Sequence, residues 1–213
     1  MSSPPPYLIC EGYEDVEFFK YLIEERKLPG FKVIDTRKPQ ERSGSISKIG
    51  AKLNSIRNSN INRFSQIPHI VIVIDCDDDP NGNFENVKNQ IEKYFPGQSP
   101  DKPFDRSKSS PSFSIAMIPW EKEAGNLEKL CLEPAKSING DLRSKIEQFM
   151  ATVNADKWPE TRKSKAWLRA YLPVACERDP SVTLGTVFND HRELIPANHE
   201  TLNRISDYLA SFA

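Results

Sequence analysis

The sequence predicts an α/β fold in which a central, mainly parallel sheet of about four strands is flanked by helices and followed by a helical C-terminal part. Short apolar runs alternate with segments of helical periodicity over the first half of the chain. The run 70–74 is aliphatic at every position, which is typical of a strand buried on both faces of a sheet. Beyond residue 125 the apolar spacing is mostly helical.

The expected elements follow one another in the order β-α-β-α-β-α-β before the last helices begin. Strands are expected at 7–10, 31–35, 70–74 and 114–118. The helices between them are expected at 15–26, 46–56 and 84–95. Further helices are expected at 126–132, 140–152, 162–172 and 198–212. The segment 96–112 is rich in Pro, Ser and charge, which predicts a mobile loop or an inserted flap.

The length of 213 residues is enough for one domain with a sizeable core. We expect a single domain over 1–213, with the α/β core at about 7–133 and a helical extension at about 134–213. Lys and Arg number 29 and Asp and Glu number 30, for a formal net charge of -1. This balance excludes a protein that coats nucleic acid by bulk charge alone.

The composition predicts a cytoplasmic protein without a membrane contact. Its apolar runs fall far short of the ~20 residues that cross a bilayer. The first residues, MSSPPP, lack the charged and apolar regions of a signal peptide. The four cysteines are widely spaced and form no CxxC motif, which indicates free thiols in a reducing compartment.

Carboxylates follow two of the expected strands at the point where each strand ends. Glu11 follows the run 7–10, and Asp75 and Asp77 follow the run 70–74. Ligands of open parallel sheets bind at the carboxyl ends of the strands, and alternate strand residues point the same way. We therefore expect Asp75 and Asp77 to aim at one point near Glu11. Converging carboxylates stay charged together only around a cation, and oxygen ligands select Mg²⁺ or Mn²⁺.

The segments YLICEGYEDVEFFKYLI and HIVIVIDCDDDP resemble the Toprim domain, a Rossmannoid fold. Topoisomerases, bacterial primases, recombination-repair proteins and nucleases of the overcoming-lysogenisation-defect type share that domain. The resemblance covers about 7–133, and Gly125 with Glu128 is similar to a Gly-x-x-Glu segment of small, uncharacterised bacterial Toprim-related proteins. The sequence has no recognisable topoisomerase tyrosine and no GxxxxGK[ST] motif, so topoisomerase and primase activity are not expected.

The resemblance implies a set of catalytic carboxylates that also bind the metal, Glu11, Asp75 and Asp77, with Glu128 as a further ligand. It also implies a supporting set around them: Gly12, Asp15 and Asp79. Gly12 would allow a tight turn beside a phosphate, and Asp15 would act from one turn into its helix.

The same residues have plainer interpretations. Glu11 also suits an ordinary strand-end turn, and Glu128 an ordinary helix start. Asp75 and Asp77 also suit a solvated acidic turn that caps the next helix. An Asp-x-Asp pair also opens the haloacid-dehalogenase phosphatases, although that family has Thr or Val where Asp79 stands and places the pair on its first strand.

Basic residues gather in two regions. Residues 31–68 hold eight Lys and Arg against two acidic residues, and a second cluster spans 162–169. Four lysines are candidates for phosphate contacts: Lys48, Lys52, Lys163 and Lys165. Such runs are equally typical of solvated helix faces. One of the three tryptophans, Trp120, Trp158 and Trp167, also suits base stacking, and the sequence does not select which.

The sequence thus predicts a Mg²⁺-dependent Toprim-type nuclease or phosphodiester-processing enzyme that acts on nucleic acid in bacterial defence or in DNA or RNA processing. A first alternative is a non-catalytic Toprim module that binds metal and nucleic acid within a multi-protein system. A minor alternative is a small-molecule phosphatase of dehalogenase type. A partner protein and a homo-oligomer both stay open.

Overall fold

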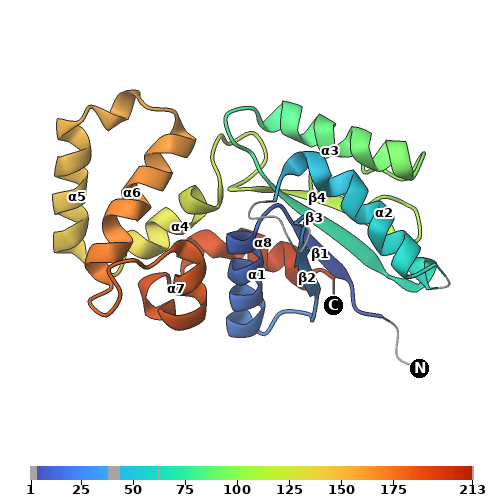
Figure 1. Ribbon diagram of the computed structural model, residues 1–213, viewed down its shortest axis with the longest axis horizontal. Helices are drawn as coiled ribbons and strands as arrows, with labels where there is room; N and C mark the ends of the chain where they lie inside the picture. The colour runs from blue at the N-terminus through green and yellow to red at the C-terminus, as the bar shows by residue number, and fades with distance from the viewer. Residues whose placement is uncertain (1–3, 38–43, 62, 213) are drawn as a thin grey trace.

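The computed structural model describes residues 4–37, 44–61 and 63–212. Its four strands form one sheet in the order β2-β1-β3-β4, and every neighbouring pair is parallel (Figure 1). The strands are β1 (Tyr7–Cys10), β2 (Lys32–Asp35), β3 (His69–Asp75) and β4 (Ser112–Ile118). The helices between them are α1 (Tyr13–Arg26), α2 (Ile49–Ser59) and α3 (Pro80–Tyr94). The expected α/β class and its parallel sheet are therefore confirmed.

Both faces of the sheet are buried, because successive strand residues point into two different cores. Leu8 and Val71 belong to the core that α1 and the C-terminal helices cover. Ile9 and Ile72 belong to the core that α2 and α3 cover. Figure 1 shows these helix layers on opposite sides of the strands. This double burial explains why the run 70–74 contains no polar residue.

The second half of the chain is helical, as expected. Its helices are α4 (Leu127–Lys136), α5 (Gly140–Thr152), α6 (Glu160–Ala175), α7 (Leu184–Asp190) and α8 (Asn203–Ala210). Short 3-10 turns are η1 (Ile46–Lys48), η2 (Phe64–Gln66), η3 (Ala155–Lys157), η4 (Arg192–Leu194) and η5 (Glu200–Leu202). Helix α7 lies where the sequence analysis placed no element, and α8 begins at Asn203, later than the residue 198 expected.

Helix α7 was missed although its sequence carries a signal. Thr183 caps the helix by accepting from the backbone N–H of Thr186, and Leu184, Val187 and Phe188 are buried at helical spacing. The helix packs against α1, where Phe188 meets Phe18 with ring centroids 5.3 Å apart. A helix of two turns presents too short a pattern to stand out without that partner.

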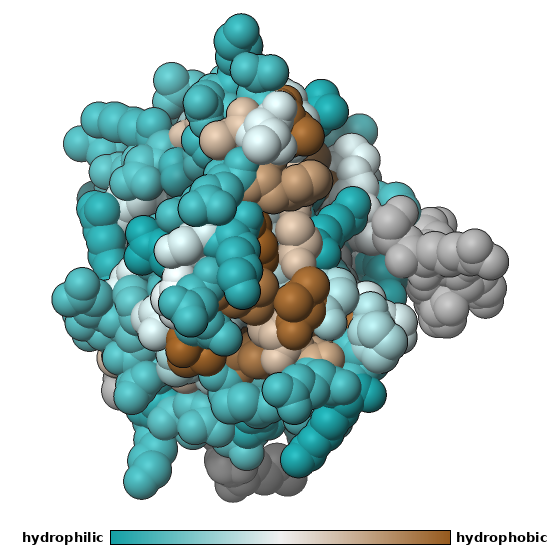
Figure 2. Space-filling view, turned by 90° about the vertical axis from the view of Figure 1, so that its left-hand side faces the viewer, coloured by the Kyte–Doolittle hydropathy of each residue, from teal (hydrophilic) through white to brown (hydrophobic). Residues whose placement is uncertain are grey.

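Helices α5 and α6 form one end of the molecule, at the left of Figure 1. Figure 2 looks onto this end and shows a band of apolar side chains between hydrophilic ones. Exposed apolar residues of these helices include Phe149 of α5 and Val174 of α6. Within the described ranges no helix is both long and apolar enough to cross a lipid bilayer.

Candidate functional site

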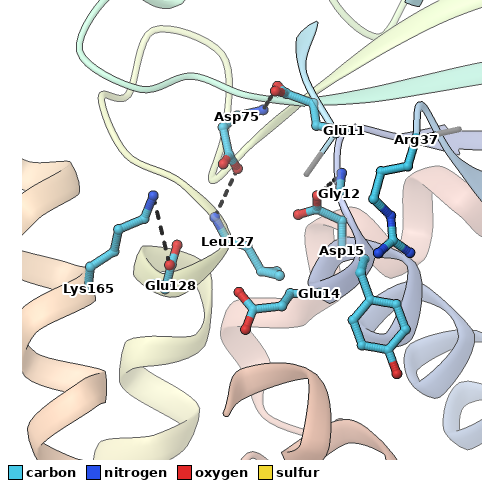
Figure 3. A pocket seen from close by; sticks show the side chains of 11 residues that line it. Glu11, Gly12, Glu14, Asp15, Arg37, Asp75, Leu127, Glu128 and Lys165 are labelled. Carbon is cyan, nitrogen blue, oxygen red and sulfur yellow. Dashed lines mark hydrogen bonds and ion pairs between the residues drawn. The ribbon is translucent and has the colours of Figure 1, made fainter. Parts of the chain in front are cut away.

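A pocket of about 400 Å³ opens at the carboxyl edge of the sheet, where β1 and β3 end. Its wall combines these strand ends with the first turns of α1 and α4 and with one residue of α6. The lining residues are Glu11, Gly12, Tyr13, Glu14, Asp15, Arg37, Gly44, Asp75, Leu127, Glu128 and Lys165. Figure 3 shows the carboxyl groups of Asp75, Asp15, Glu14 and Glu128 around one open space, with Lys165 and Arg37 on opposite sides.

The start of α1 directs Asp15 to this space. Gly12 is the N-cap of the helix, and its backbone N–H donates to Asp15 Oδ2 at 2.9 Å. The carboxylate therefore lies beside the positive end of the helix dipole. Gly12 itself has a φ of -130°, an extended conformation that other residues adopt, so its contribution here is the backbone N–H.

The first turn of α4 positions the carboxylate of Asp75 in the same way. The backbone N–H of Leu127, the first residue of α4, donates to Asp75 Oδ1 at 3.0 Å. Asn126 caps the helix and accepts from the backbone N–H of Lys129 at 3.1 Å. Glu128 lies in the same first turn and also lines the pocket, so it adds a second carboxylate beside that of Asp75. Two helix N-termini thus converge on one acidic space.

Glu11 follows β1 directly and turns its carboxylate back toward β3. Its Oε1 accepts from the backbone N–H of Asp75 at 3.1 Å (Figure 3). Its own carbonyl oxygen accepts from Thr36 Oγ1 at 2.9 Å, which ties the end of β1 to the segment after β2. Glu11 is therefore held at both its backbone and its side chain.

The carboxyl groups of this pocket share raised pKa values. Loss of solvation raises the pKa of Glu11 to about 7, and hydrogen bonds from the backbone at Asp75 and Ile46 oppose the rise. Burial also raises the pKa of Asp15 to about 7, against the hydrogen bond from Gly12. The pKa of Asp75 lies well above its ordinary value because of burial and then the charges of its carboxylate neighbours. These groups cannot all be charged at neutral pH without added positive charge.

Among the described residues, two cations border the pocket, one on each side. Lys165 Nζ lies 3.9 Å from Glu128 Oε1, and its charge lowers the pKa of Glu128 against the larger effect of burial. Arg37 is held on the other side by Asp35, the last residue of β2, with 2.6 Å between Arg37 Nε and Asp35 Oδ2. The Arg37 guanidinium also lies over the Tyr13 ring.

The expected metal ligands do not all meet at this pocket. Glu11, Asp75 and Glu128 line it, whereas Asp77 is exposed and lines a neighbouring pocket. Strand β3 ends at Asp75, and Asp77 has a φ of 48°, so the alternation that would aim the two aspartates at one point has stopped. The backbone N–H of Asp77 donates to the carbonyl of Gly125 at 2.6 Å, which fixes this turn to the segment before α4.

The expected supporting residues divide in the same way. Asp15 belongs to the pocket, but Asp79 caps α3 by accepting from the backbone N–H of Gly82 at 2.9 Å. Among the candidate phosphate contacts, Lys165 lines the pocket, and Lys163 instead forms an ion pair with Glu160 at 2.8 Å. The remaining two, Lys48 and Lys52, lie in η1 and α2 and do not line it. Lys38 and Arg42 of the basic segment 31–68 lie outside the described residues.

The donor chemistry of the pocket fits a hard divalent cation, since its ligands would be carboxylate oxygens. Asp15, Asp75 and Glu11 each use one oxygen on a backbone N–H. Their arrangement is open: among the described residues no three His, Cys, Asp or Glu side chains are close enough together to hold a metal ion. Asp15, Asp75 and Glu128 are the residues of this pocket that would hold a divalent cation.

Five residues that line the pocket were not among the candidate site residues: Tyr13, Glu14, Arg37, Gly44 and Leu127. Arg37 had a usable signal, because it stands two residues after β2 and so at the same carboxyl edge as Glu11 and Asp75. Glu14 had one as well, in the first turn of the helix that follows Glu11.

One family model matches residues 5–213, and its description is "Protein of unknown function (DUF3226)". No curated protein and no solved structure matches the chain. The family match covers nearly the whole length and includes every residue of the pocket.

Proposed function

The chain belongs to the family described as "Protein of unknown function (DUF3226)", and we propose that it cleaves phosphodiester bonds of nucleic acid with Mg²⁺ or Mn²⁺. The observation that carries the proposal is the convergence of Asp75, Asp15 and Glu128 on one pocket at the carboxyl edge of a parallel sheet. Their raised pKa values mark a site that lacks positive charge, which is what a divalent cation supplies.

The resemblance to Toprim domains supports the choice of substrate. The matching text contains Glu11 after the first strand and Asp75 after the third, and both side chains belong to the pocket. Within that group, nuclease activity is the one that requires no additional domain. Asp77, which the resemblance also includes, lies beside the pocket.

The residues of the chain have distinct tasks in this reaction. Asp75, Asp15 and Glu128 would hold the ion, which neutralises phosphate charge and lowers the pKa of a bound water. Glu11, with a pKa of about 7, is suited to give a proton to the leaving oxygen or take one from the attacking water at neutral pH. Lys165 borders the carboxylates and can offset the negative charge of the phosphate as the P–O bond breaks.

The test is a cleavage assay on the purified chain with supercoiled plasmid, single-stranded DNA and RNA. Each substrate is incubated with Mg²⁺, with Mn²⁺ or with EDTA, for the wild type and for Asp75→Asn. The control variant is Asp207→Asn, which makes the same change at an exposed position of α8.

The proposal expects cleavage that needs the divalent cation, is lost in Asp75→Asn and persists in Asp207→Asn. Equal cleavage by all three proteins would mean a contaminating nuclease, and no cleavage of any substrate would remove the catalytic proposal.

One observation favours a second candidate, a module that binds metal and nucleic acid without cleaving it. The carboxylates are spread around the pocket, and three of them each use an oxygen on the backbone. A site that stays this open binds a cation weakly. Metal-dependent binding of nucleic acid without product in the same assay would select this candidate.

A further inference from the structure

Helix α6 presents a stripe of basic side chains beside the acidic pocket. Arg162, Lys165 and Arg169 are spaced three and four residues apart, so they lie on one face of the helix. Together with Asp77, Trp158, Thr161 and Ala166 they line a pocket of about 550 Å³. Lys165 also lines the acidic pocket, so this stripe and the proposed cleavage site meet at one residue.

The charge of this stripe is little neutralised by the protein itself. Arg162 and Arg169 are exposed, and within the described residues neither guanidinium forms an ion pair. Lys165 is 3.9 Å from Glu128, longer than a hydrogen bond. Lys163, on the same helix, is instead paired with Glu160 at 2.8 Å. The stripe therefore has positive charge available for an anion.

An aromatic ring stands at the start of the stripe. Trp158 precedes α6 and is half-buried, and the Arg162 guanidinium lies over its ring, 4.2 Å from the centroid. Of the other two tryptophans, Trp120 has Phe104 stacked on its ring with centroids 3.8 Å apart, and Trp167 is only 5% exposed. Trp158 is the tryptophan that shares a pocket with the cations of the α6 stripe.

Polar contacts hold α6 in place against the acidic edge of the sheet. Thr161 Oγ1 donates to Asp78 Oδ1 at 3.2 Å, which joins the start of α6 to the turn after β3. Ser164 Oγ lies 3.0 Å from Oδ1 of Asn126, the residue that caps α4. The stripe is therefore positioned relative to Asp75 by the same segments that build the acidic pocket.

We propose that this α6 stripe binds a single strand of nucleic acid, with its phosphates on Arg162, Lys165 and Arg169 and one base stacked on Trp158. The strand then runs past Lys165 to the acidic pocket, and what happens to it there rests on the proposed function. Residues 162–169 span ~10 Å of helix axis.

Stacking decides between a single strand and a duplex. A base can stack on an aromatic side chain only when it is unstacked from its neighbours, as in single strands. The α6 stripe offers one row of cations, which follows one backbone.

The experiment measures binding in EDTA, so that it depends neither on metal nor on cleavage. Fluorescence anisotropy follows a labelled oligothymidylate and a labelled duplex of equal length, over a series of salt concentrations. The variants are Trp158→Ala and the double variant Arg162→Gln with Arg169→Gln. Lys145→Gln is the control, because Lys145 is exposed on α5 and outside both pockets. Circular dichroism confirms that each variant is folded.

We expect the single strand to bind more tightly than the duplex, and Trp158→Ala to weaken it about fivefold or more. The double variant should weaken binding more than tenfold and reduce the slope of log K against log salt by about 1.4, because ~0.7 is lost per phosphate contact. Lys145→Gln should match the wild type. Binding that is unchanged in the double variant, equal for duplex and single strand, or absent in the wild type would overturn the inference.

The binding results do not depend on whether the protein cleaves nucleic acid. Single-strand binding that depends on Arg162, Arg169 and Trp158 would stand even when no cleavage is found. Conversely, metal-dependent cleavage whose KM is the same in the double variant and the wild type would retain the proposed function and remove the α6 stripe from it.

Discussion

The carboxylate of Glu11 accepts a hydrogen bond from the backbone N–H of Asp75, with 3.1 Å between Oε1 and the nitrogen. The two residues are 64 positions apart in the sequence; Glu11 follows β1 and Asp75 ends the neighbouring parallel strand β3, so the register of the sheet sets their approach. Burial is the largest cause that raises the pKa of both carboxyl groups, and the charge of Glu11 adds to the rise at Asp75. The backbone N–H of Asp75 lowers the pKa of Glu11, against burial and the charges of Asp15 and Asp77. Both residues line the acidic pocket.

Asp75→Asn should lower activity and raise stability at the same time. The asparagine oxygen can still accept from Leu127, and the neutral amide needs no proton to lie among the carboxylates whose charges raise the pKa of Asp75. We expect cleavage to fall about a hundredfold or more, as for the loss of a metal ligand or its support. The Tm of the metal-free protein at pH 8 should rise by ~3 °C per kcal/mol of relieved repulsion. A lower Tm, measured by thermal unfolding in EDTA, would contradict the electrostatic account.

The metal-free protein should become more stable as the pH falls from 8 to about 5. Glu11 and Asp15 each have a folded-state pKa of about 7, above their ordinary values, so the folded protein binds protons that the unfolded chain does not. Their stabilising contribution is complete below the unfolded pKa values and is lost as the pH rises through 7. The measurement is Tm against pH in EDTA.

Added Mg²⁺ should offset the loss of stability at high pH, because the bound cation takes the place of the protons on the carboxyl groups. The rise in Tm on adding Mg²⁺ should be larger at pH 8 than at pH 5, where the carboxyl groups hold protons. Asp75→Asn should reduce the rise at pH 8. An equal effect of Mg²⁺ at both pH values would argue against binding at these carboxylates.

Gly44→Ala should destabilise the protein and disturb the pocket. A Cβ at Gly44 would clash with the carbonyl oxygen of Glu11, so the segment before α2 would have to move away from β1. We expect a cost of about 1–3 kcal/mol, the usual effect of forced overpacking. Gly30→Ala is the matched control, because nothing lies within 4 Å of its Cβ. Chemical denaturation of both variants checks the difference, and equal stability would show that Gly44 has room to shift.

Lys165→Met should move the acidic limb of the pH–rate profile to higher pH. The ammonium of Lys165 lowers the pKa values of Asp77, Asp15 and Glu128. Its removal raises these pKa values, so the three carboxyl groups ionise at a higher pH. The rate should also fall about tenfold to a hundredfold, because a charge that faces the phosphate is gone. Lys145→Met serves as the control at an exposed position of α5. A profile that keeps its position would mean that Lys165 does not act on these carboxylates.

Much of the fold could be predicted because its signals are local. The uninterrupted aliphatic run at 70–74 predicted a strand covered on both faces, and two cores enclose it. Most helices also lie where the apolar spacing of the sequence predicted them. Helix α7 was not predicted, since its short pattern is stabilised by packing against α1, which the sequence does not display.

The candidate site was predictable only in part. The positions of Glu11 and Asp75 followed from the rule that parallel strands end at one edge. The position of Asp77 did not, because the left-handed backbone after Asp75 interrupts the alternation on which the expectation depended. Arg37 and Glu14 belong to the pocket through the chain segments after β2 and β1, and among the described lysines it is Lys165 that reaches the pocket.

By itself, the sequence determined the order of strands and helices and the residue types at the carboxyl edge, because both depend on hydrophobic periodicity and on position along the chain. Only the tertiary structure decided which of the many charged side chains meet. Lys163 and Lys165 differ by two positions on α6, yet one pairs with Glu160 and the other borders Glu128 and Asp77. A helix turns by about 100° per residue, so the packing of α6 against α4 selects the face that the site receives.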